Sequence, residues 1–491
     1  MSLPPPAGPT DTRTADTADP APPRGRLGTH HLVLLIVAAA APLGVAIGNL
    51  PAGLILGNGI GLPTAFLAAA AVVACMATGF VRLAREVPAE GGFADLARAG
   101  LGPGAGLGVA YLTGLAYWTG SLALAAALGY FAGLIGTAYG VGLPWWAYSF
   151  AGFALVLLLG RRAADLSARM LLVLVAAEIG AVLLLDAAII VNHGWNAFPL
   201  DVFSPENALS GNLGPAVLVG FTSFIGVESA ILYTREARDP ARSVPRATYT
   251  AVAAAGLLYV LTAWLVIGAL GTGEAVAAAA EAEGDLVFGL ALGEVGDTFL
   301  VLTQVFFVTS LLACFVALHN AGARYVQTLA SRSALPRRLG RLHPRYLAPT
   351  TASTVLAVVG AALFLAFAVA GADPYIGLAT SLTGLFTLGI VAAQAIVSIA
   401  VVVHFRRRRA PLAWSTLVAP VLGGGGAVLA SVAIVANYPV LTGSDSAAAR
   451  ALPIVLLAAV AAGFAVHAFT ASRPGSPPGA PGTEEEGDPH P

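Results

Sequence analysis

The chain has 491 residues, of which 57% are hydrophobic and only 10% are charged. A soluble globular domain carries about 25% charged residues, so the composition excludes that class and indicates a protein that lies in a lipid bilayer. The formal net charge is −1 and every basic residue is an Arg, a balance that gives no reason to expect nucleic acid as a partner.

Residues 1–28 and 472–491 are rich in Pro and polar residues and contain no apolar run. We expect both segments to be disordered tails that flank a membrane domain at residues 29–471. A membrane span needs about 20 apolar residues. Runs of this kind are predicted at 31–55, 62–81, 105–134, 144–160, 168–191, 212–233, 247–270, 298–322, 349–370, 375–404, 412–438 and 449–470.

The arginines predict how these spans are oriented. With twelve spans and both tails in the cytoplasm, every Arg except Arg450 falls in a tail, an inner loop or an inner span end. Basic residues gather on the cytoplasmic side of membrane proteins, and a shift of one span would destroy the bias. The loop at 271–297 contains acidic residues and no Arg, so we expect it to lie outside the cell.

The two cysteines, Cys75 and Cys314, both lie in apolar runs. We expect them to pack as small side chains, neither paired with each other nor bound to metal. The sequence contains no zinc, haem or iron–sulfur motif, and we expect no cofactor. It also lacks a Gly-Lys-Ser/Thr phosphate-binding loop, which argues against a pump driven by ATP.

The first apolar run is interrupted by AAAAPLGVAIGNLP at 38–51. Pro42 removes a backbone donor, and Gly44 and Gly48 tolerate torsions that other residues avoid. A helix broken here points the free N–H groups of a half-helix at the membrane midplane, where they attract an anion such as a carboxylate. The alternative is a kinked but continuous helix, packed closely through its small residues.

The sixth run has a similar interruption in SFIGVESA at 223–230, where Gly226 precedes the carboxylate of Glu228. Charges within a membrane are costly and usually face a cavity or a partner; the alternative is a Glu hydrated at the membrane surface. The two interrupted runs are five spans apart. Breaks at corresponding positions of two halves are typical of a binding site built from inverted repeats.

The eighth and fifth runs contain candidate coupling groups. Thr309 and Ser310 offer hydroxyl oxygens to a small cation such as Na⁺, or bond back to their own helix. At 1.5 Å per residue, Glu178 lies about 13 Å from the inner end of its helix and Asp186 about 25 Å. Glu178 is the better candidate for proton handling, since a carboxylate removed from water takes up a proton more readily. The alternative is a structural hydrogen bond to a neighbouring helix.

These features resemble the amino acid–polyamine–organocation (APC) transporters of the amino acid permease type. SFIGVESA with REARDPARSVPRAT is similar to the sixth helix of that family and the loop after it. PAEGGF at 88–93 followed by GLGPGAG is similar to its second-to-third loop, and HNAGARYVQTLASRSALPRRLGRLHPRYLAP to the end of its eighth helix and the loop beyond. The resemblance implies an all-α membrane fold of twelve helices: an inverted repeat of five plus five (about 31–191 and 212–404) with two extra helices (about 412–470).

The resemblance also implies a site. A substrate carboxylate is then held by the first interruption, at Ala41, Pro42, Leu43, Gly44 and Gly48. An amino group is held by freed carbonyls of the second, at Ser223, Phe224, Ile225 and Gly226. Glu228 matches the acid that follows the broken segment, and Thr309 and Ser310 match a sodium-site hydroxyl pair. Some relatives carry a Lys in the fifth helix that replaces the cation, and this chain has no Lys.

The function that these observations imply is a secondary active transporter in the plasma membrane, not an enzyme. It moves an amino acid or small amine by alternating access, with proton-coupled symport expected and sodium-coupled symport or amino acid/amine exchange as alternatives. A non-transporting sensor or scaffold needs a folded soluble domain, which the tails do not predict. An intramembrane enzyme needs a nucleophile–base or metal constellation that the sequence does not contain. The substrate, the direction of transport and the oligomeric state stay open.

Overall fold

The computed structural model describes residues 28–87, 91–161, 168–229, 237–332, 334–343, 348–371, 373–444 and 446–472. The secondary structure of this part of the chain is helical, with no β-strand among its elements. The two expected tails lie outside the described residues, apart from Gly28 and Ser472.

Ten helices in the described ranges are long and apolar enough to cross a membrane, and two shorter apolar helices, α7 and α10, occupy the fourth and sixth expected runs. The spanning helices are α1 (Thr29–Ala39) with α2 (Pro42–Gly44) and α3 (Leu50–Leu56), α4 (Leu62–Ala84), α6 (Pro103–Ala138), α7 (Trp145–Arg161), α8 (Ala168–His193), α10 (Leu213–Thr222), α12 (Pro240–Leu270), α15 (Asp297–Ser331), α16 (Thr350–Val369), α17 (Thr380–Arg407), α18 (Ala419–Ala436) and α21 (Ile454–Ala471). The short connecting helices are α5 (Phe93–Leu101), α9 (Pro205–Ala208), α13 (Ala275–Ala282), α14 (Leu286–Glu294), α19 (Tyr438–Thr442) and α20 (Ala447–Ala451).

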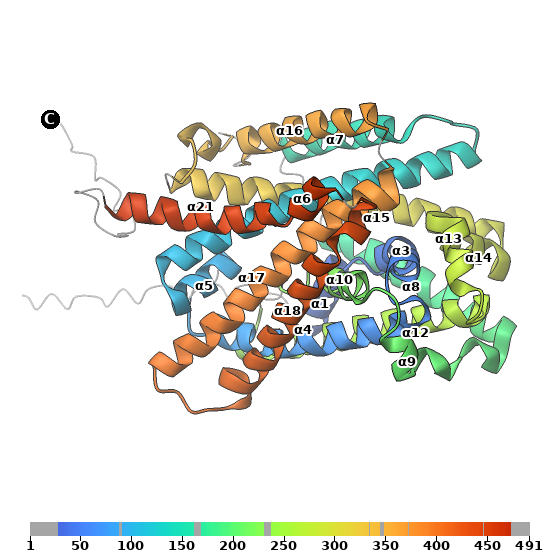
Figure 1. Cartoon of the computed structure of the whole chain (residues 1–491), viewed down its shortest axis with the longest axis horizontal. Helices are drawn as coiled ribbons and strands as arrows, with labels where there is room; N and C mark the ends of the chain where they lie inside the picture. Colours follow the sequence, from blue (N-terminus) through green and yellow to red (C-terminus); the bar gives the residue numbers. More distant parts are fainter. Residues whose placement is uncertain are drawn as a thin grey trace, which may run out of the picture.

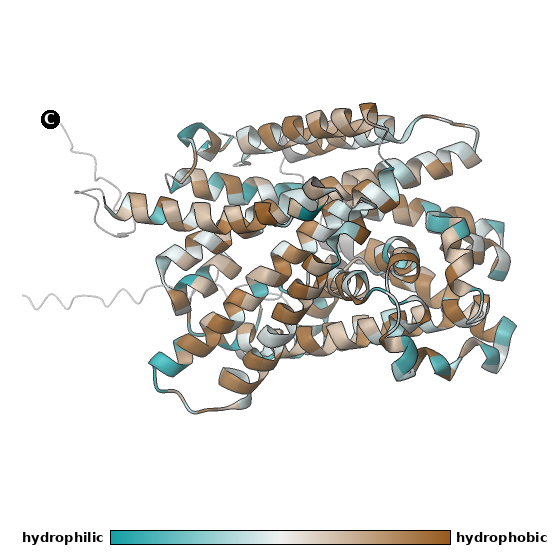
Figure 2. Cartoon of the chain, in the orientation of Figure 1, coloured by the Kyte–Doolittle hydropathy of each residue, from teal (hydrophilic) through white to brown (hydrophobic). Residues whose placement is uncertain are grey.

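The long helices share one general direction, and α17 and α18 cross the others obliquely (Figure 1). Helix α5 lies at one end of this bundle, and α13 and α14 lie at the opposite end. Apolar residues dominate the middle of the helices, and hydrophilic residues gather towards the two ends (Figure 2). This pattern suits a bundle whose middle lies in hydrocarbon and whose ends meet water.

The outer surface of the bundle is apolar where lipid is expected. Val358 on α16, Leu429 on α18 and Leu457 on α21 are 58%, 72% and 70% exposed. Apolar side chains on such a surface cost nothing in a bilayer, whose hydrocarbon tails are as apolar as Leu.

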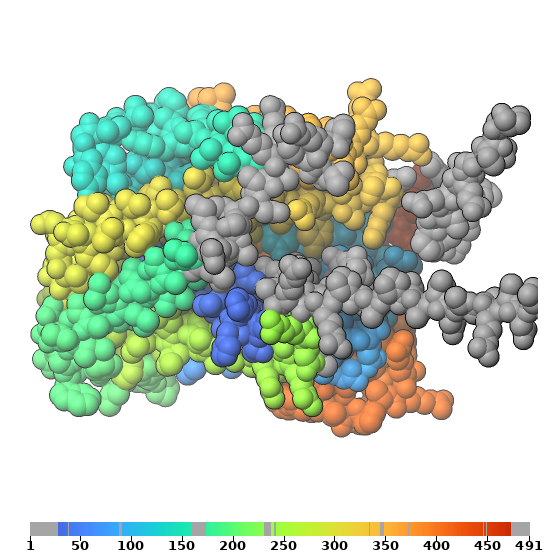
Figure 3. All heavy atoms as spheres, turned by 180° about the vertical axis from the view of Figure 1, so that it is seen from behind, coloured from blue at the N-terminus to red at the C-terminus, as the bar shows by residue number. Residues whose placement is uncertain are grey.

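Small residues allow the helices to approach closely. Gly108 on α6 and Gly463 on α21 face each other, and a Cβ on Gly463 would collide with the Gly108 backbone. Contacts of this kind are typical of membrane helices, which associate through close packing because burial from lipid supplies little hydrophobic driving force. On the opposite face, α8 and α15 pack side by side (Figure 3).

Candidate functional site

The first span is broken at Ala41. The backbone of Ala41 has φ 44° and ψ 70°, a left-handed conformation that separates α1 from α2. Pro42 then begins α2, where its missing N–H costs no helical hydrogen bond. A π-helical turn, Val45–Asn49, joins α2 to α3. The carbonyl oxygen of Ala40, freed by the break, accepts a hydrogen bond from the Tyr259 hydroxyl at 3.2 Å.

The sixth span is broken after α10. Gly226 has φ 114°, a conformation that residues with a Cβ rarely adopt. A Cβ at Gly226 would lie 2.6 Å from the carbonyl carbon and oxygen of Ala39, so the two broken segments are in direct contact. A second link is the hydrogen bond from the Asn49 amide to the Ser223 hydroxyl, at 3.3 Å. The breaks that the sequence predicts separately therefore form one region.

Glu228 folds back onto the sixth-span break. Its Oε2 accepts a hydrogen bond of 2.8 Å from the backbone N–H of Gly226, and the hydroxyl of Tyr117 lies next to the carboxylate. The Tyr117 ring stacks on Tyr325, with ring centres 5.8 Å apart. The acid is thus held by polar groups from its own segment and from α6.

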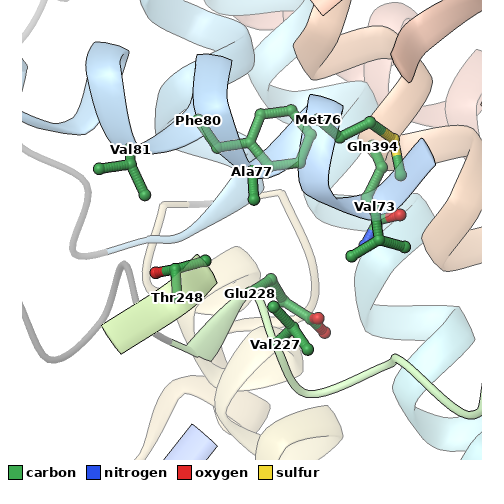
Figure 4. Close-up of a pocket in the computed structure, with 9 residues that line it drawn as sticks. All are labelled: Val73, Met76, Ala77, Phe80, Val81, Val227, Glu228, Thr248 and Gln394. Carbon is green, nitrogen blue, oxygen red and sulfur yellow. The ribbon is translucent and has the colours of Figure 1, made fainter. Parts of the chain in front are cut away.

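A small cavity opens beside Glu228. Figure 4 shows side chains of α4 on one side of it and Val227, Glu228 and Thr248 on the other. The cavity offers about 20 Å³ to the centre of a water-sized sphere, which is enough for about one water molecule. It is far smaller than an amino acid, so a substrate needs a more open conformation. The complete lining is Val73, Met76, Ala77, Phe80, Val81, Val227, Glu228, Thr248 and Gln394.

Glu178 lies at the first-span break. Its side chain is 2% exposed and lies close to the backbone N–H of Leu43 and the hydroxyl of Ser310. Its Oε2 has no hydrogen-bond partner. Three elements distant in sequence, α2, α8 and α15, therefore meet around one buried carboxylate with unused hydrogen-bonding capacity.

Of the other predicted coupling residues, one lies beside Glu178 and two lie away from it. Ser310 is buried beside Glu178, but Thr309 is exposed and its hydroxyl bonds back to the carbonyls of Val305 and Phe306, each at 2.9 Å. In this structure only the Ser310 hydroxyl is directed to Glu178, and a cation site formed by both hydroxyls stays a prediction. Asp186 is 2% exposed and accepts a hydrogen bond of 2.9 Å from Thr262 on α12.

A layer of aromatic side chains lies between the first-span break and the turn that joins α13 to α14. The Tyr375 hydroxyl donates to the carbonyl of Gly48 at 2.9 Å. The Tyr130 ring stacks on Tyr375, with centres 4.7 Å apart and planes 12° apart. The Tyr130 hydroxyl lies 3.4 Å from Oε2 of Glu283, in the turn between α13 and α14. The carbonyl of Gly48, a predicted substrate-binding residue, is thus bonded to this aromatic layer.

Sequence reasoning missed the tyrosines that surround the breaks: Tyr117, Tyr130, Tyr259, Tyr325 and Tyr375. A signal was available, because a tyrosine in an apolar span normally needs a partner for its hydroxyl. Their partners could not be read from the sequence, since each partner lies far from its tyrosine along the chain. In the described part of the chain, no group of three or more His, Cys, Asp or Glu side chains could hold a metal ion.

The sequence is similar to those of known membrane transporters. Residues 27–464 match the model of a family described as "Amino acid permease". An uncharacterized transporter of Mycobacterium bovis is 30% identical over 347 residues, which cover 69% of this chain and 73% of the relative. An uncharacterized transporter of Mycobacterium tuberculosis matches with the same identity and coverage.

The fold is also similar to that of solved structures. A manganese transporter of Eremococcus coleocola, crystallised with an aromatic bis-isothiourea substituted compound, matches with a TM-score of 0.55 and 15% identity over 90% of this chain and 93% of that chain. A variant of the same transporter gives a TM-score of 0.54 with 14% identity and the same coverage. At this identity the likeness concerns the fold alone.

Proposed function

Because the chain belongs to the amino acid permease family, we propose that this membrane transporter is a secondary active permease that moves an amino acid or small amine by alternating access. The observation that carries the proposal is the contact between two broken helices, where Gly226 meets Ala39. Each break also has an acid, since Glu228 accepts a bond from Gly226 and Glu178 lies by Leu43. Broken helices expose backbone donors and acceptors that an intact helix uses internally, and transporters bind substrate and ions there.

Coupling to protons is the second part of the proposal. Glu228 lies beside the cavity and the sixth-span break, and Glu178 lies at the first-span break. A carboxylate that alternates between a closed and a hydrated environment takes up and releases a proton as its surroundings change. We assign the principal proton to Glu228 and a secondary role to Glu178.

Sodium coupling is the second candidate. Ser310 lies next to Glu178, and oxygen ligands of this kind suit a hard cation. With the Thr309 hydroxyl bonded to its own helix, a sodium site needs backbone carbonyls from the break at Ala41 to complete the shell. Exchange of an amino acid for an amine uses the same substrate site and needs neither ion.

The deciding experiment is uptake of labelled amino acids and amines into proteoliposomes. An inward proton gradient and an inward sodium gradient are imposed separately, with a third set of vesicles that carries no gradient but contains unlabelled substrate. We expect accumulation with the proton gradient. Accumulation only with sodium, or only against internal substrate, would assign one of the other two modes, and no uptake of any compound would reject the permease.

We further propose that the protein lies in the plasma membrane with both termini in the cytoplasm and the α13–α14 segment outside. Ala277 on α13 and Ser331 at the end of α15 are both exposed. In a background with Cys75 and Cys314 replaced by Ala, Ala277→Cys should react with an impermeant thiol reagent added to intact cells. Ser331→Cys should react only after the cells are opened, and the reverse pattern would invert the topology.

A further inference from the structure

Three acidic side chains lie inside the bundle, and no ion pair found among the described residues joins them to a basic side chain. Glu178, Asp186 and Glu228 lie within the apolar part of the chain, which contains no Lys. The arginines of the described spanning helices lie near helix ends, as Arg82 on α4 and Arg246 on α12 do. Buried carboxylates are normally paired with a cation or hold a proton. With the transported proton assigned to Glu228, a cationic group of the cargo is the partner that suits Glu178.

The start of α2, where a substrate carboxylate is expected to bind, already has a protein carboxylate nearby. Pro42, the first residue of α2, has no N–H. The next N–H, that of Leu43, lies close to the carboxylate of Glu178. A second carboxylate brought to this end of the helix would meet Glu178 at close range, and like charges in a site shielded from water repel strongly.

The groups around Glu178 suit an ammonium ion. Its Oε2 is a buried acceptor without a partner. Tyr259 lies near Glu178 and donates its hydroxyl to Ala40, and its ring packs against Phe224 of the sixth-span break, with ring centres 5.6 Å apart. Aromatic rings beside a carboxylate attract organic cations through the negative face of the ring.

We propose that the cargo is an organic ammonium ion without a free carboxylate, which binds between Glu178 and the break at Ala41. This inference rests on the proposed permease function and narrows its substrate from amino acids and amines to amines. The ammonium group takes the unpartnered oxygen of Glu178 as its acceptor and neutralises the buried charge. A zwitterionic amino acid is disfavoured because its carboxylate would lie against that of Glu178, which already occupies the Leu43 N–H at the start of α2.

The test compares matched pairs of compounds that differ in the carboxylate. Thermal unfolding of the full chain in detergent at pH 8 is measured with putrescine and ornithine, phenethylamine and phenylalanine, and the amides of both amino acids. A ligand that binds the folded protein raises the unfolding temperature. We expect the amines and amides to stabilise the protein and the parent amino acids to bind at least about tenfold more weakly.

The outcomes separate this inference from the proposed function. If an amino acid binds as tightly as its amine, and is taken up by proteoliposomes, the amine proposal is wrong and the permease function stands. If no compound binds and none is taken up, both are rejected. If amines and amides bind and are taken up, and amino acids do neither, both are supported.

A pair of variants identifies the residue. Glu178→Gln removes the charge with little change of volume, and we expect at least about a tenfold loss in amine affinity. Glu206→Gln, on the short helix α9 at the α13–α14 end of the bundle, changes the same functional group and should leave affinity unaltered. Since Glu178→Gln could unfold the protein, its unfolding temperature without ligand is measured first, and Glu178→Asp, which keeps the charge, should retain amine binding. Unchanged affinity in a folded Glu178→Gln protein would overturn the assignment.

Discussion

Glu228→Gln is expected to abolish proton-driven accumulation while it preserves exchange of substrate across the membrane. The glutamine oxygen can still accept the hydrogen bond that Glu228 receives from the Gly226 N–H at 2.8 Å, so the broken segment keeps its local geometry. The amide cannot gain or lose a proton near neutral pH, so the coupling between substrate and proton is lost. Accumulation should fall to the level of vesicles without a gradient, and exchange should become independent of pH.

The control for this variant is Glu281→Gln, an exposed residue of α13. It carries the same chemical change far from the broken helices and should accumulate substrate like the parent protein. Both variants are measured in one proteoliposome assay, with exchange and accumulation recorded separately. If Glu228→Gln still concentrates substrate under a proton gradient, proton coupling through this residue is wrong and Glu178 becomes the next residue to test.

Gly226→Ala is expected to abolish transport in a protein that still inserts in the membrane. The substitution forces a side chain into a backbone with φ 114°, and its Cβ would meet the backbone of Ala39 at 2.6 Å. Strain of this kind costs about 2 kcal/mol, which corresponds to about a thirtyfold change in an equilibrium or a rate. The neighbouring atoms are backbone of the other broken span, so they cannot move aside without disturbing the site.

Two controls separate the effect of backbone strain from the effect of the contact with Ala39. Gly271→Ala also has a positive φ, 81°, but no atom lies within 4 Å of its Cβ, and Gly180→Ala on α8 meets neither strain nor contact. We expect uptake by Gly180→Ala to match the parent and uptake by Gly271→Ala to be reduced only slightly. Normal uptake by Gly226→Ala would mean that the contact between the two breaks has no role in transport.

The sequence predicted the breaks because their cause is local. Pro42 cannot continue a helix from the residue before it, and Gly226 occupies a torsion that other residues avoid, so both interruptions are visible in the letters themselves. The same local signal explains why α10, Leu213–Thr222, is shorter than a full span: the helix stops where the break begins. The helical fold and its apolar surface follow equally directly from the hydrophobic runs.

The surroundings of Glu178 could not be predicted in this way. Its neighbours Leu43, Ser310 and Tyr259 come from three other helices, and which helices meet is decided by packing over the whole bundle. Thr309 shows the converse case. A resemblance pairs it with Ser310, but in this structure its hydroxyl bonds to its own backbone, a contact that the sequence does not reveal.

Two helices of the bundle are much longer than a bilayer is thick. At 1.5 Å per residue, the 36 residues of α6 span about 54 Å, and the 35 residues of α15 about 53 Å, against a hydrocarbon core of about 30 Å. These two helices pack against each other. A tilt of about 20°, the average in membrane proteins, is too small to bring their full length within the hydrocarbon core. Their ends therefore project into water on at least one side of the membrane. The position of the protein along the membrane normal is then determined by the apolar band of the two helices and not by their length. A thicker or thinner bilayer would therefore be mismatched first at the short, partly exposed helix α7, and lipid thickness is expected to alter transport through it.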